Sequence, residues 1–530
     1  MEKISTLQKI LAFSLLSFFT ASYVTSQITP PDFLRCLDRQ PSDPTSPNSA
    51  AAYIPSNASF SAVLRRRIPN LRFDKPTTPK PIAVVAAATW THLPAALGCS
   101  RELGIQVRIR SGGHDFEGLS YISNVPFYVL DMFNFRSVDV NLTEASAWVD
   151  SGVTIGELCY RIAEKTKVYG FPAGLYPTLG VGGHFSGGGY GNLMRKYGLS
   201  VDNVVGSGIV DSNGNIYTDR VSMGENVFWA IRGGGGASFG IVLGYRIRLV
   251  PVPEKVTVFN VSRTVEDGAS DLVWKWQEFA YKTDRNLFVR LTLTPVNGKR
   301  AGEKTVLASF VGMYLGRSDG VVSILNRGLP ELRLKKTDCT EMSWIESVVF
   351  WAGYPIGTPT SVLLNREPPK LFMKRKSDYV KNPISKPGID AILKKLTEIE
   401  KVKMVWNPYG GRMSEIPETR TPFPHRSGNV FNVEYVVDWS ESGDDAEKDH
   451  VERARKMHEF MTPYVSTNPR EAFLNYRDLD VGSNVNFTYE EGKVFGVKYF
   501  KNNFERLVDV KSRFDPDNFY RNEQSIPVRK

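Results

Sequence analysis

The stretch that decides the fold is Gly180-Val-Gly-Gly-His-Phe-Ser-Gly-Gly-Gly-Tyr-Gly191, which has seven glycines in twelve residues. Two more glycine-rich segments lie on either side of it, Arg110-Ser-Gly-Gly-His-Asp-Phe-Glu-Gly118 and Arg232-Gly-Gly-Gly-Gly-Ala-Ser-Phe-Gly240. Glycine permits a positive φ and lets the backbone approach a ligand, and successive free N–H groups can hold phosphates. Tight corners alone would explain one such loop. Three of them within roughly 130 residues, two carrying a histidine, favour a large phosphate-bearing cofactor.

The spacing of these glycines narrows the kind of site. None of the three segments matches the dinucleotide fingerprint GxGxxG or the P-loop GxxxxGK[ST]. Neither a Rossmann NAD site nor a P-loop nucleoside triphosphatase is therefore supported. The composition, with 42% hydrophobic and 23% charged residues among 530, is that of a globular chain with room for two to four domains.

The first 26 residues predict the compartment. Lys3 and Lys9 precede an apolar run from Ile10 to Phe19, and small residues follow before Gln27. This pattern is typical of a secretory signal peptide, and the run is too short to span a membrane; an uncleaved anchor is the alternative. We expect a protein secreted to the extracellular space or cell wall.

Charge and cysteine usage agree with secretion. The net charge is 66 − 56 = +10, and the basic residues are scattered, which favours attraction to anionic polymers over nucleic-acid binding. The four cysteines form no CxxC pair, so we expect no zinc cluster or other metal site, and three complete disulfide pairings stay open. Four sequons are candidate glycosylation sites, at Asn57, Asn141, Asn260 and Asn486.

Hydrophobic periodicity predicts alternating helices and strands after a loop-rich segment at 27–75. We expect strands at 105–110, 126–131, 147–153, 204–211, 241–250, 287–293, 305–313 and 429–437. We expect helices at 82–97, 154–165, 272–283, 447–461 and around 497–514.

Several motifs together resemble those of the plant berberine bridge enzyme-like family of FAD-linked oxidoreductases, within the vanillyl-alcohol-oxidase superfamily. The motifs are Arg110-Ser-Gly-Gly-His114, the 182–191 glycine run, the 232–240 loop, Pro422-Phe-Pro-His-Arg426, Asn475-Tyr-Arg-Asp-Leu-Asp480, Asp515-Pro-Asp-Asn-Phe519 and Glu523-Gln-Ser-Ile-Pro527. The resemblance runs from about Cys36 to Pro527.

The resemblance implies an α+β fold with two parts. A two-lobed FAD-binding domain would cover residues 27–252, mainly 75–252, and be completed by the segment 471–530. A substrate domain at 253–470 would hold an antiparallel sheet backed by helices. A Cys36–Cys99 disulfide is also implied, which leaves Cys159 and Cys339 as free, buried thiols.

In this family the histidine of the Ser-Gly-Gly-His motif is bonded to the flavin, which implies a covalent link through His114. A neutral imidazole is a competent nucleophile near physiological pH. Most relatives have a second tether, a cysteine, where this chain has Tyr176 in Gly174-Leu-Tyr-Pro-Thr178. We therefore expect a single covalent bond to FAD. Leu179 stands at the position that controls oxygen access in the family, which favours a dehydrogenase with poor oxygen reactivity.

The reacting groups implied by the resemblance are Glu434, Tyr190 and Tyr476. In Asn432-Val-Glu434 the strand alternation puts the asparagine and glutamate on one face, and a carboxylate against apolar flavin would be a useful base. Relatives with an ionised tyrosine carry a lysine where this chain has Asn432. That mechanism is in doubt here, so Glu434 is the first choice for the base and a tyrosine is the alternative.

The expected cofactor contacts share the glycine-rich loops and their neighbours: Ser111, Gly112, Gly113, Asp115, Tyr176, Leu179, Gly183, His184, Gly189, Gly235, Gly236, Gly240 and Asn475. The predicted function is oxidation of an alcohol or carbohydrate hydroxyl by hydride transfer to FAD, with a small alcohol, sugar or phenolic substrate and an unidentified electron acceptor. The alternatives are an alkaloid or phenolic ring-forming oxidase, and a flavin-binding protein without turnover.

Overall fold

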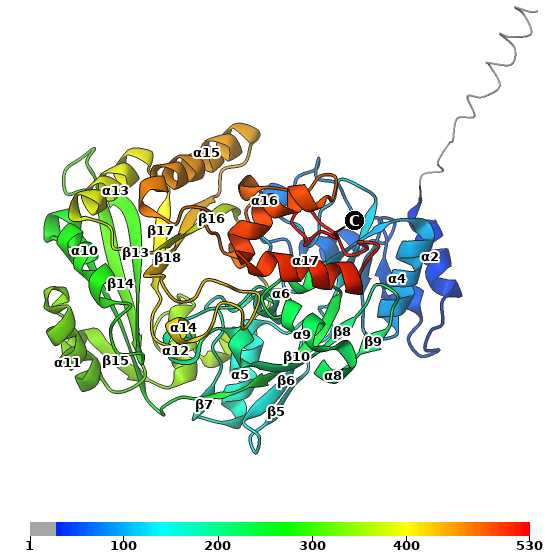
Figure 1. The fold of residues 1–530 in the computed structure, drawn as a ribbon, viewed down its shortest axis with the longest axis horizontal. Coiled ribbons are helices and arrows are strands. Elements are labelled where there is room, and N and C mark those ends of the chain that lie inside the picture. The colour runs from blue at the N-terminus through cyan, green and yellow to red at the C-terminus, as the bar shows by residue number, and fades with distance from the viewer. Residues whose placement is uncertain (1–27, 530) are drawn as a thin grey trace, which may run out of the picture.

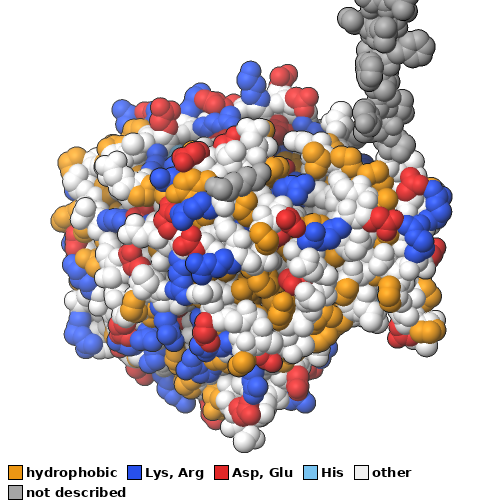
Figure 2. All heavy atoms as spheres, turned by 45° about the vertical axis from the view of Figure 1, so that its right-hand side comes forward, with side chains coloured by type: hydrophobic (Ala, Val, Ile, Leu, Met, Phe, Trp, Pro, Cys, Tyr) orange, Lys and Arg blue, Asp and Glu red, His pale blue; other side chains and the backbone are white. Residues whose placement is uncertain are grey.

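The computed structural model describes residues 28–529, so the predicted signal peptide lies outside the described residues. Within that range three main sheets form the framework (Figure 1). No helix of the described range is both long and apolar enough to cross a membrane. Figure 2 shows a face on which lysine and arginine side chains are interspersed with aspartate and glutamate.

The first sheet has four strands in the order β1-β2-β4-β3, and β2, β4 and β3 are parallel. Their bounds are β1 Ala52–Tyr53, β2 Val84–Ala86, β3 Gln106–Arg110 and β4 Phe127–Asp131. Helices α2 (Pro30–Arg39) and α4 (His92–Leu103) pack together beside this sheet in one apolar cluster. The Cys36–Cys99 disulfide joins these two helices, which confirms the implied pairing.

The second sheet has five antiparallel strands in the order β5-β6-β10-β8-β9. Their bounds are β5 Val138–Asn141, β6 Ser146–Asp150, β8 Val204–Val210, β9 Ile216–Tyr217 and β10 Ile241–Arg248. Helix α5 (Ile155–Lys165) is capped by Thr154, which forms a capping box with Glu157. The C-terminal helices α16 (Tyr489–Phe500) and α17 (Asn503–Phe514) share this core with α9 (Glu225–Ala230).

The third sheet has seven antiparallel strands in the order β15-β12-β14-β13-β17-β18-β16. Their bounds are β12 Val256–Thr264, β13 Leu287–Asn297, β14 Lys304–Tyr314, β15 Cys339–Met342, β16 Phe372–Val380, β17 Lys403–Pro408 and β18 Phe431–Trp439. Helices α10 (Ala269–Phe279), α13 (Lys386–Ile399) and α15 (Asp444–Phe460) cover one face (Figure 1). Val433 and Tyr435 of β18 point into that core, so the alternate residues Asn432 and Glu434 share the opposite face.

The remaining elements are short or peripheral. They are α3 Phe60–Arg65, α6 Val181–Ser186, α7 Met194–Tyr197, α8 Arg220–Met223, α11 Ser318–Gly328, α12 Trp344–Trp351, α14 Arg412–Glu415, β7 Tyr169–Gly170 and β11 Val250–Pro251. The expected α+β class, with an antiparallel sheet backed by helices, is confirmed.

Three expectations about local structure were wrong. The helix expected at 82–97 is a buried strand followed by a helix that starts at His92, because the apolar run at 83–87 forms an inner strand of the first sheet, between β1 and β4. The segment 27–75 contains α2, whose first residue is Pro30; a proline at that position lacks only an N–H that the first helical turn leaves unpaired. The tail helix is two helices, interrupted at Lys501 with φ 51°.

The burial of the other two cysteines and of the sequon asparagines can be compared with expectation. Cys159 is a free, buried thiol as expected, whereas Cys339 is free but only half-buried, so the expectation of burial was wrong there. The asparagines of all four sequons are exposed.

Candidate active site

A cavity of about 530 Å³ opens between the glycine-rich loops and the uncovered face of the seven-stranded sheet. All of the predicted site residues except one line it. They are Ser111, Gly112, Gly113, His114, Asp115, Tyr176, Leu179, Gly183, His184, Tyr190, Gly235, Gly236, Gly240, Glu434, Asn475 and Tyr476.

Gly189 is the exception, because it does not line the cavity. Its φ is +72°, and a Cβ there would lie 2.5 Å from Ser200 Oγ. This glycine makes a turn against protein atoms, so the structure gives its expected cofactor contact no support.

The glycines of the first two loops also serve backbone packing. A Cβ on Gly112 would lie 2.3 Å from the nitrogen of Gly180, and a Cβ on Gly180 would lie 2.2 Å from the nitrogen of Gly112. The two loops therefore meet backbone to backbone. By contrast, a Cβ on Gly183 would meet no atom within 4 Å, so this residue borders open space. Tight backbone packing therefore explains Gly112 and Gly180, whereas close approach of a ligand would explain Gly183.

His114 stands in the middle of the first loop, half-buried against the cavity. Its Nε2 is 2.9 Å from Thr178 Oγ1, and its ring centroid is 5.7 Å from that of Tyr176. Burial, with a smaller contribution from the Arg67 charge, lowers the pKa of His114 to about 4. The imidazole is therefore neutral at physiological pH, and Nδ1 makes no hydrogen bond within the described residues.

His184 and Asn475 hold the surrounding loops. The backbone N–H of Gly174 donates to His184 Nε2 at 2.8 Å, and Asn475 Nδ2 donates to the carbonyl of His184 at 2.9 Å. Burial, and then the neighbouring His114, lowers the pKa of His184 to about 4. His184 is thus a neutral acceptor that fixes the segment carrying Tyr176.

Two tyrosines meet at the far end of the cavity. The hydroxyl groups of Tyr190 and Tyr476 are hydrogen-bonded to each other, and Asn407 Nδ2 donates to Tyr190 Oη at 3.0 Å. Arg290 Nε in turn donates to Asn407 Oδ1 at 2.7 Å. Burial raises the pKa of Tyr190 to about 12 and that of Tyr476 well above its usual value, and the Glu434 charge adds to both. Both phenols are therefore protonated donors at physiological pH.

Glu434 projects from β18 into the cavity, but its surroundings are not purely apolar. Its Oε1 lies 3.4 Å from Arg375 Nε, and the same guanidinium binds Asp438 Oδ1 at 2.6 Å. An arginine from the neighbouring strand therefore faces this carboxylate, in addition to the apolar flavin expected beside it.

Asp115 is also engaged. Its Oδ2 pairs with Arg477 Nε at 2.7 Å, and its Oδ1 accepts the N–H of Glu117 at 3.0 Å. A carboxylate repels a pyrophosphate, so direct contact between this side chain and a phosphate of the cofactor is disfavoured.

Polar atoms along the cavity wall test whether a cofactor such as FAD fits. Among the described residues, Ser120 Oγ, Ser151 Oγ and Arg477 Nη1 are buried with no hydrogen-bond partner, and all three residues line the cavity. Buried polar groups are normally satisfied. These unpaired donors lie in the same cavity as the neutral His114 and the open space at Gly183. Such a wall fits a large polar ligand that carries phosphates.

Sequence reasoning missed three arginines of the site, namely Arg290, Arg375 and Arg477. Arg375 belongs to the short basic run 374–376, and the structure buries all three of these side chains. The available signal was strand alternation, because in a strand the side chain of Arg375 points to the face opposite that of Lys374 and Lys376. Nothing in the local sequence marks Arg290.

Comparisons with known proteins agree with this geometry. Residues 81–220 match the model of an FAD binding domain, and residues 472–527 match the berberine and berberine-like model. Berberine bridge enzyme-like 10 of Arabidopsis thaliana is 72% identical over 527 residues, which is 99% of this chain and 100% of the relative.

Solved structures of similar proteins cover nearly the whole chain. The structure of Arabidopsis thaliana BBE-like #28 is 44% identical with a TM-score of 0.88, covering 94% of this chain and 100% of the other. Phl p 4, a grass pollen allergen with glucose dehydrogenase activity, is 41% identical with a TM-score of 0.88, covering 94% and 99%. One of its variants, with an isoleucine replaced by valine, is described as a glucose oxidase. On this fold, these motifs and these relatives, the chain belongs to the berberine bridge enzyme-like family of FAD-dependent oxidoreductases.

Proposed function

We propose that this protein oxidises an alcohol or carbohydrate hydroxyl, with FAD held by one covalent bond to His114. The observation that carries the proposal is the cavity itself, which places a neutral histidine, a carboxylate and two phenols around one space. The glucose dehydrogenase activity of Phl p 4 supports a sugar hydroxyl as the substrate group.

The single attachment is supported by the surroundings of His114. Thr178 engages Nε2, which leaves Nδ1 as the nitrogen available for a bond to carbon. Tyr176 lies beside this histidine, and a phenol cannot form the thioether of a doubly tethered relative. His114, Ser120, Ser151 and Arg477 would hold the cofactor, together with the glycine backbone.

The reaction needs a base for the hydroxyl proton and an orientation for the C–H bond. When bound, FAD supplies the acceptor for the hydride. Glu434 is the proposed base, since both tyrosines hold their protons at physiological pH. Tyr190 and Tyr476 would donate hydrogen bonds that orient the substrate oxygen.

The electron acceptor is proposed to be a molecule other than oxygen. Leu179 lines the cavity next to the Tyr176 segment. In Phl p 4 one isoleucine-to-valine change separates a glucose dehydrogenase from a glucose oxidase, so a single branched side chain can decide oxygen use in this fold. The signal-peptide pattern and the exposed sequon asparagines support secretion to the extracellular space or cell wall.

The test has two arms. A tryptic peptide spanning His114 should carry the mass of FAD, and His114→Ala should release the cofactor on acid precipitation. Anaerobic mixing of the purified holoenzyme with oligosaccharides, monolignols and benzylisoquinolines should bleach the flavin with one carbohydrate or alcohol class. Bleaching by benzylisoquinolines alone would favour the ring-forming oxidase. No bleaching by any of them would favour a flavin-binding protein without turnover.

A further inference from the structure

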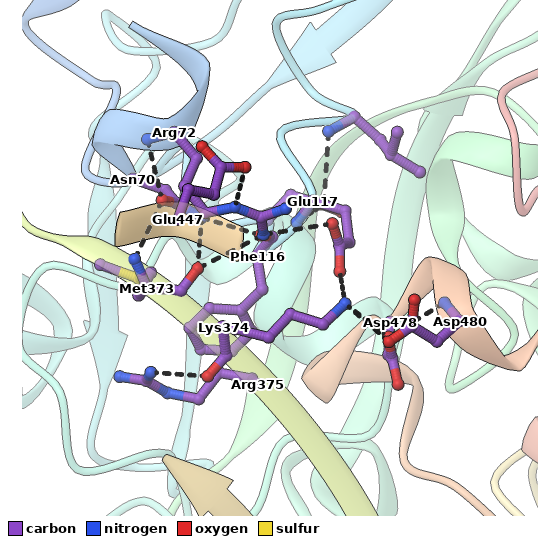
Figure 3. A network of polar contacts seen from close by, with 12 residues as sticks. Asn70, Arg72, Phe116, Glu117, Met373, Lys374, Arg375, Glu447, Asp478 and Asp480 are labelled. Atoms are coloured by element: carbon purple, nitrogen blue, oxygen red, sulfur yellow. Dashed lines mark hydrogen bonds and ion pairs between the residues drawn. The ribbon is translucent and has the colours of Figure 1, made fainter. Parts of the chain in front are cut away.

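A network of buried charges lies behind the cavity wall (Figure 3). At its centre Lys374 Nζ contacts Glu117 Oε1 at 2.5 Å and Asp478 Oδ1 at 2.7 Å. The three side chains are 2%, 4% and 2% exposed. Burial disfavours the charged lysine, but the Asp478 and Glu117 carboxylates outweigh it and raise the pKa of Lys374.

The network continues in both directions and balances its charges. Lys376 Nζ contacts Asp478 Oδ2 at 2.6 Å and Asp480 Oδ2 at 2.9 Å. On one side Arg72 contacts Glu447, which also contacts Lys75, and Lys75 contacts Asp444. On the other side Arg455 contacts Asp480. The cluster is neutral as a whole, because it holds five cations and five carboxylates: Arg72, Lys75, Lys374, Lys376 and Arg455 with Glu117, Asp444, Glu447, Asp478 and Asp480.

The network joins the segments that carry the reacting groups. Glu117 is three residues beyond His114, and Asp478 is two residues beyond Tyr476. The same two loops meet a second time through the Asp115–Arg477 ion pair. Lys374 thus stands between the loop of the proposed attachment residue and the loop of the tyrosine pair.

The network also reaches the proposed base. Arg375 follows Lys374 on β16 and points to the opposite face of that edge strand, where it contacts Glu434 and Asp438. Its guanidinium carbon lies 5.2 Å from the ring centroid of Phe116. The neighbours of Lys374 in the chain, Met373 and Arg375, both line the cavity, whereas Lys374 itself does not.

Stability alone does not account for this arrangement. Replacing a buried ion pair by neutral groups of similar volume is often neutral or stabilising, whereas removing one partner leaves an uncompensated charge. Buried charges can instead specify one arrangement of the segments that carry them, because any other arrangement would leave a charge unpaired.

We propose that Lys374 is a positioning residue, which through Glu117 and Asp478 fixes the 114–117 loop relative to the 475–478 loop. The proposal rests on the proposed function for its catalytic consequence. Its structural content, the relative order of the two loops, can be measured without any substrate.

The test compares variants that separate charge balance from position. Lys374→Met alone should lower the thermal midpoint, since Glu117 loses its main partner. Lys374→Met with Glu117→Gln keeps the charge balance, because Asp478 retains Lys376 and Arg72 retains Glu447. The matched control is Lys386→Met with Asp390→Asn, a helix-surface ion pair whose residues do not line the cavity.

In the balanced variant we expect a thermal midpoint close to that of the parent, and faster hydrogen exchange in peptides covering 112–118 and 474–480. The rate of flavin reduction should fall about tenfold to a hundredfold with KM nearly unchanged. The control pair should change none of these. Parental exchange and parental reduction rate in the balanced variant would overturn the proposal. Failure of the balanced variant to fold would also overturn the proposal, because the network would then be required for folding and not specifically for positioning the two loops. If no substrate reduces even the parent, the exchange result still decides the positioning role, and only the proposed function falls.

Discussion

Replacing Glu434 by glutamine is the sharpest test of the chemistry. Glutamine keeps the size of the side chain and an acceptor oxygen for Arg375, which retains Asp438 at 2.6 Å. No buried charge is left unpaired, so we expect a loss of folding free energy of about 1 kcal/mol or less. The amide cannot take a proton from the substrate, however. Loss of a general base costs about 10²–10⁴-fold, or about 2.7–5.4 kcal/mol of transition-state stabilisation.

The assay is the rate constant of flavin reduction, followed by stopped-flow absorbance under anaerobic conditions with the substrate found in the screen. KM should change by less than about threefold, because the hydrogen-bonding shape of the site is kept. Asp438→Asn is the matched control, since it removes a carboxylate from the same arginine and leaves Glu434 in place. A reduction rate in Glu434→Gln equal to that of Asp438→Asn would refute the assignment and make the tyrosine pair the source of the base.

Three further outcomes follow from the same geometry. Leu179→Val should speed reoxidation of the reduced flavin in air, whereas Leu175→Val on the same cavity wall should not; equal rates would contradict oxygen gating at Leu179. Gly180→Ala should cost about 3 kcal/mol or more in urea unfolding, because its Cβ would lie 2.1 Å from a serine hydroxyl of the facing loop, while Gly183→Ala should be nearly neutral. His184 has its folded pKa lowered from 6.5 to about 4, so the unfolded chain binds the proton first and the free energy of unfolding should fall as pH drops from about 6.5 to about 4. His184→Gln should flatten that part of the pH dependence, and an unchanged slope would argue against a buried neutral imidazole.

The sequence predicted the parts of the site that depend on local chemistry. The glycine-rich loops, the histidine within the first of them and the alternation around Glu434 each follow from residues close together in the chain. These residues line one cavity, and the role of each of them stays a prediction. Secondary structure was least predictable where the local pattern is ambiguous, as in the apolar run at 83–87 that forms a strand.

What the sequence could not provide are pairings between distant residues. Lys374 and Glu117 are 257 positions apart, and Arg195 on α7 donates to carbonyls about ninety residues away. The run Lys374-Arg375-Lys376 looks like solvated surface charge until the edge strand, the tail and the first glycine-rich loop come together around it. Burial of such a run depends on partners that no window of sequence contains.

The ionic contacts around Lys374 bear on how a cofactor held by one covalent bond would be oriented. A single bond leaves a ring free to turn about it, so the orientation must come from the surrounding wall. In this chain the loop of His114 is bound to the loop of Tyr476 by two separate ionic contacts, Asp115 with Arg477 and Glu117 through Lys374 to Asp478. The proposed attachment point and the phenol that would orient the substrate therefore move together. Glu434 is coupled to them through Arg375, which lies next to Lys374 on β16. On this proposal, the relative positions of His114, Tyr476 and Glu434 depend on direct contacts among the segments that carry them.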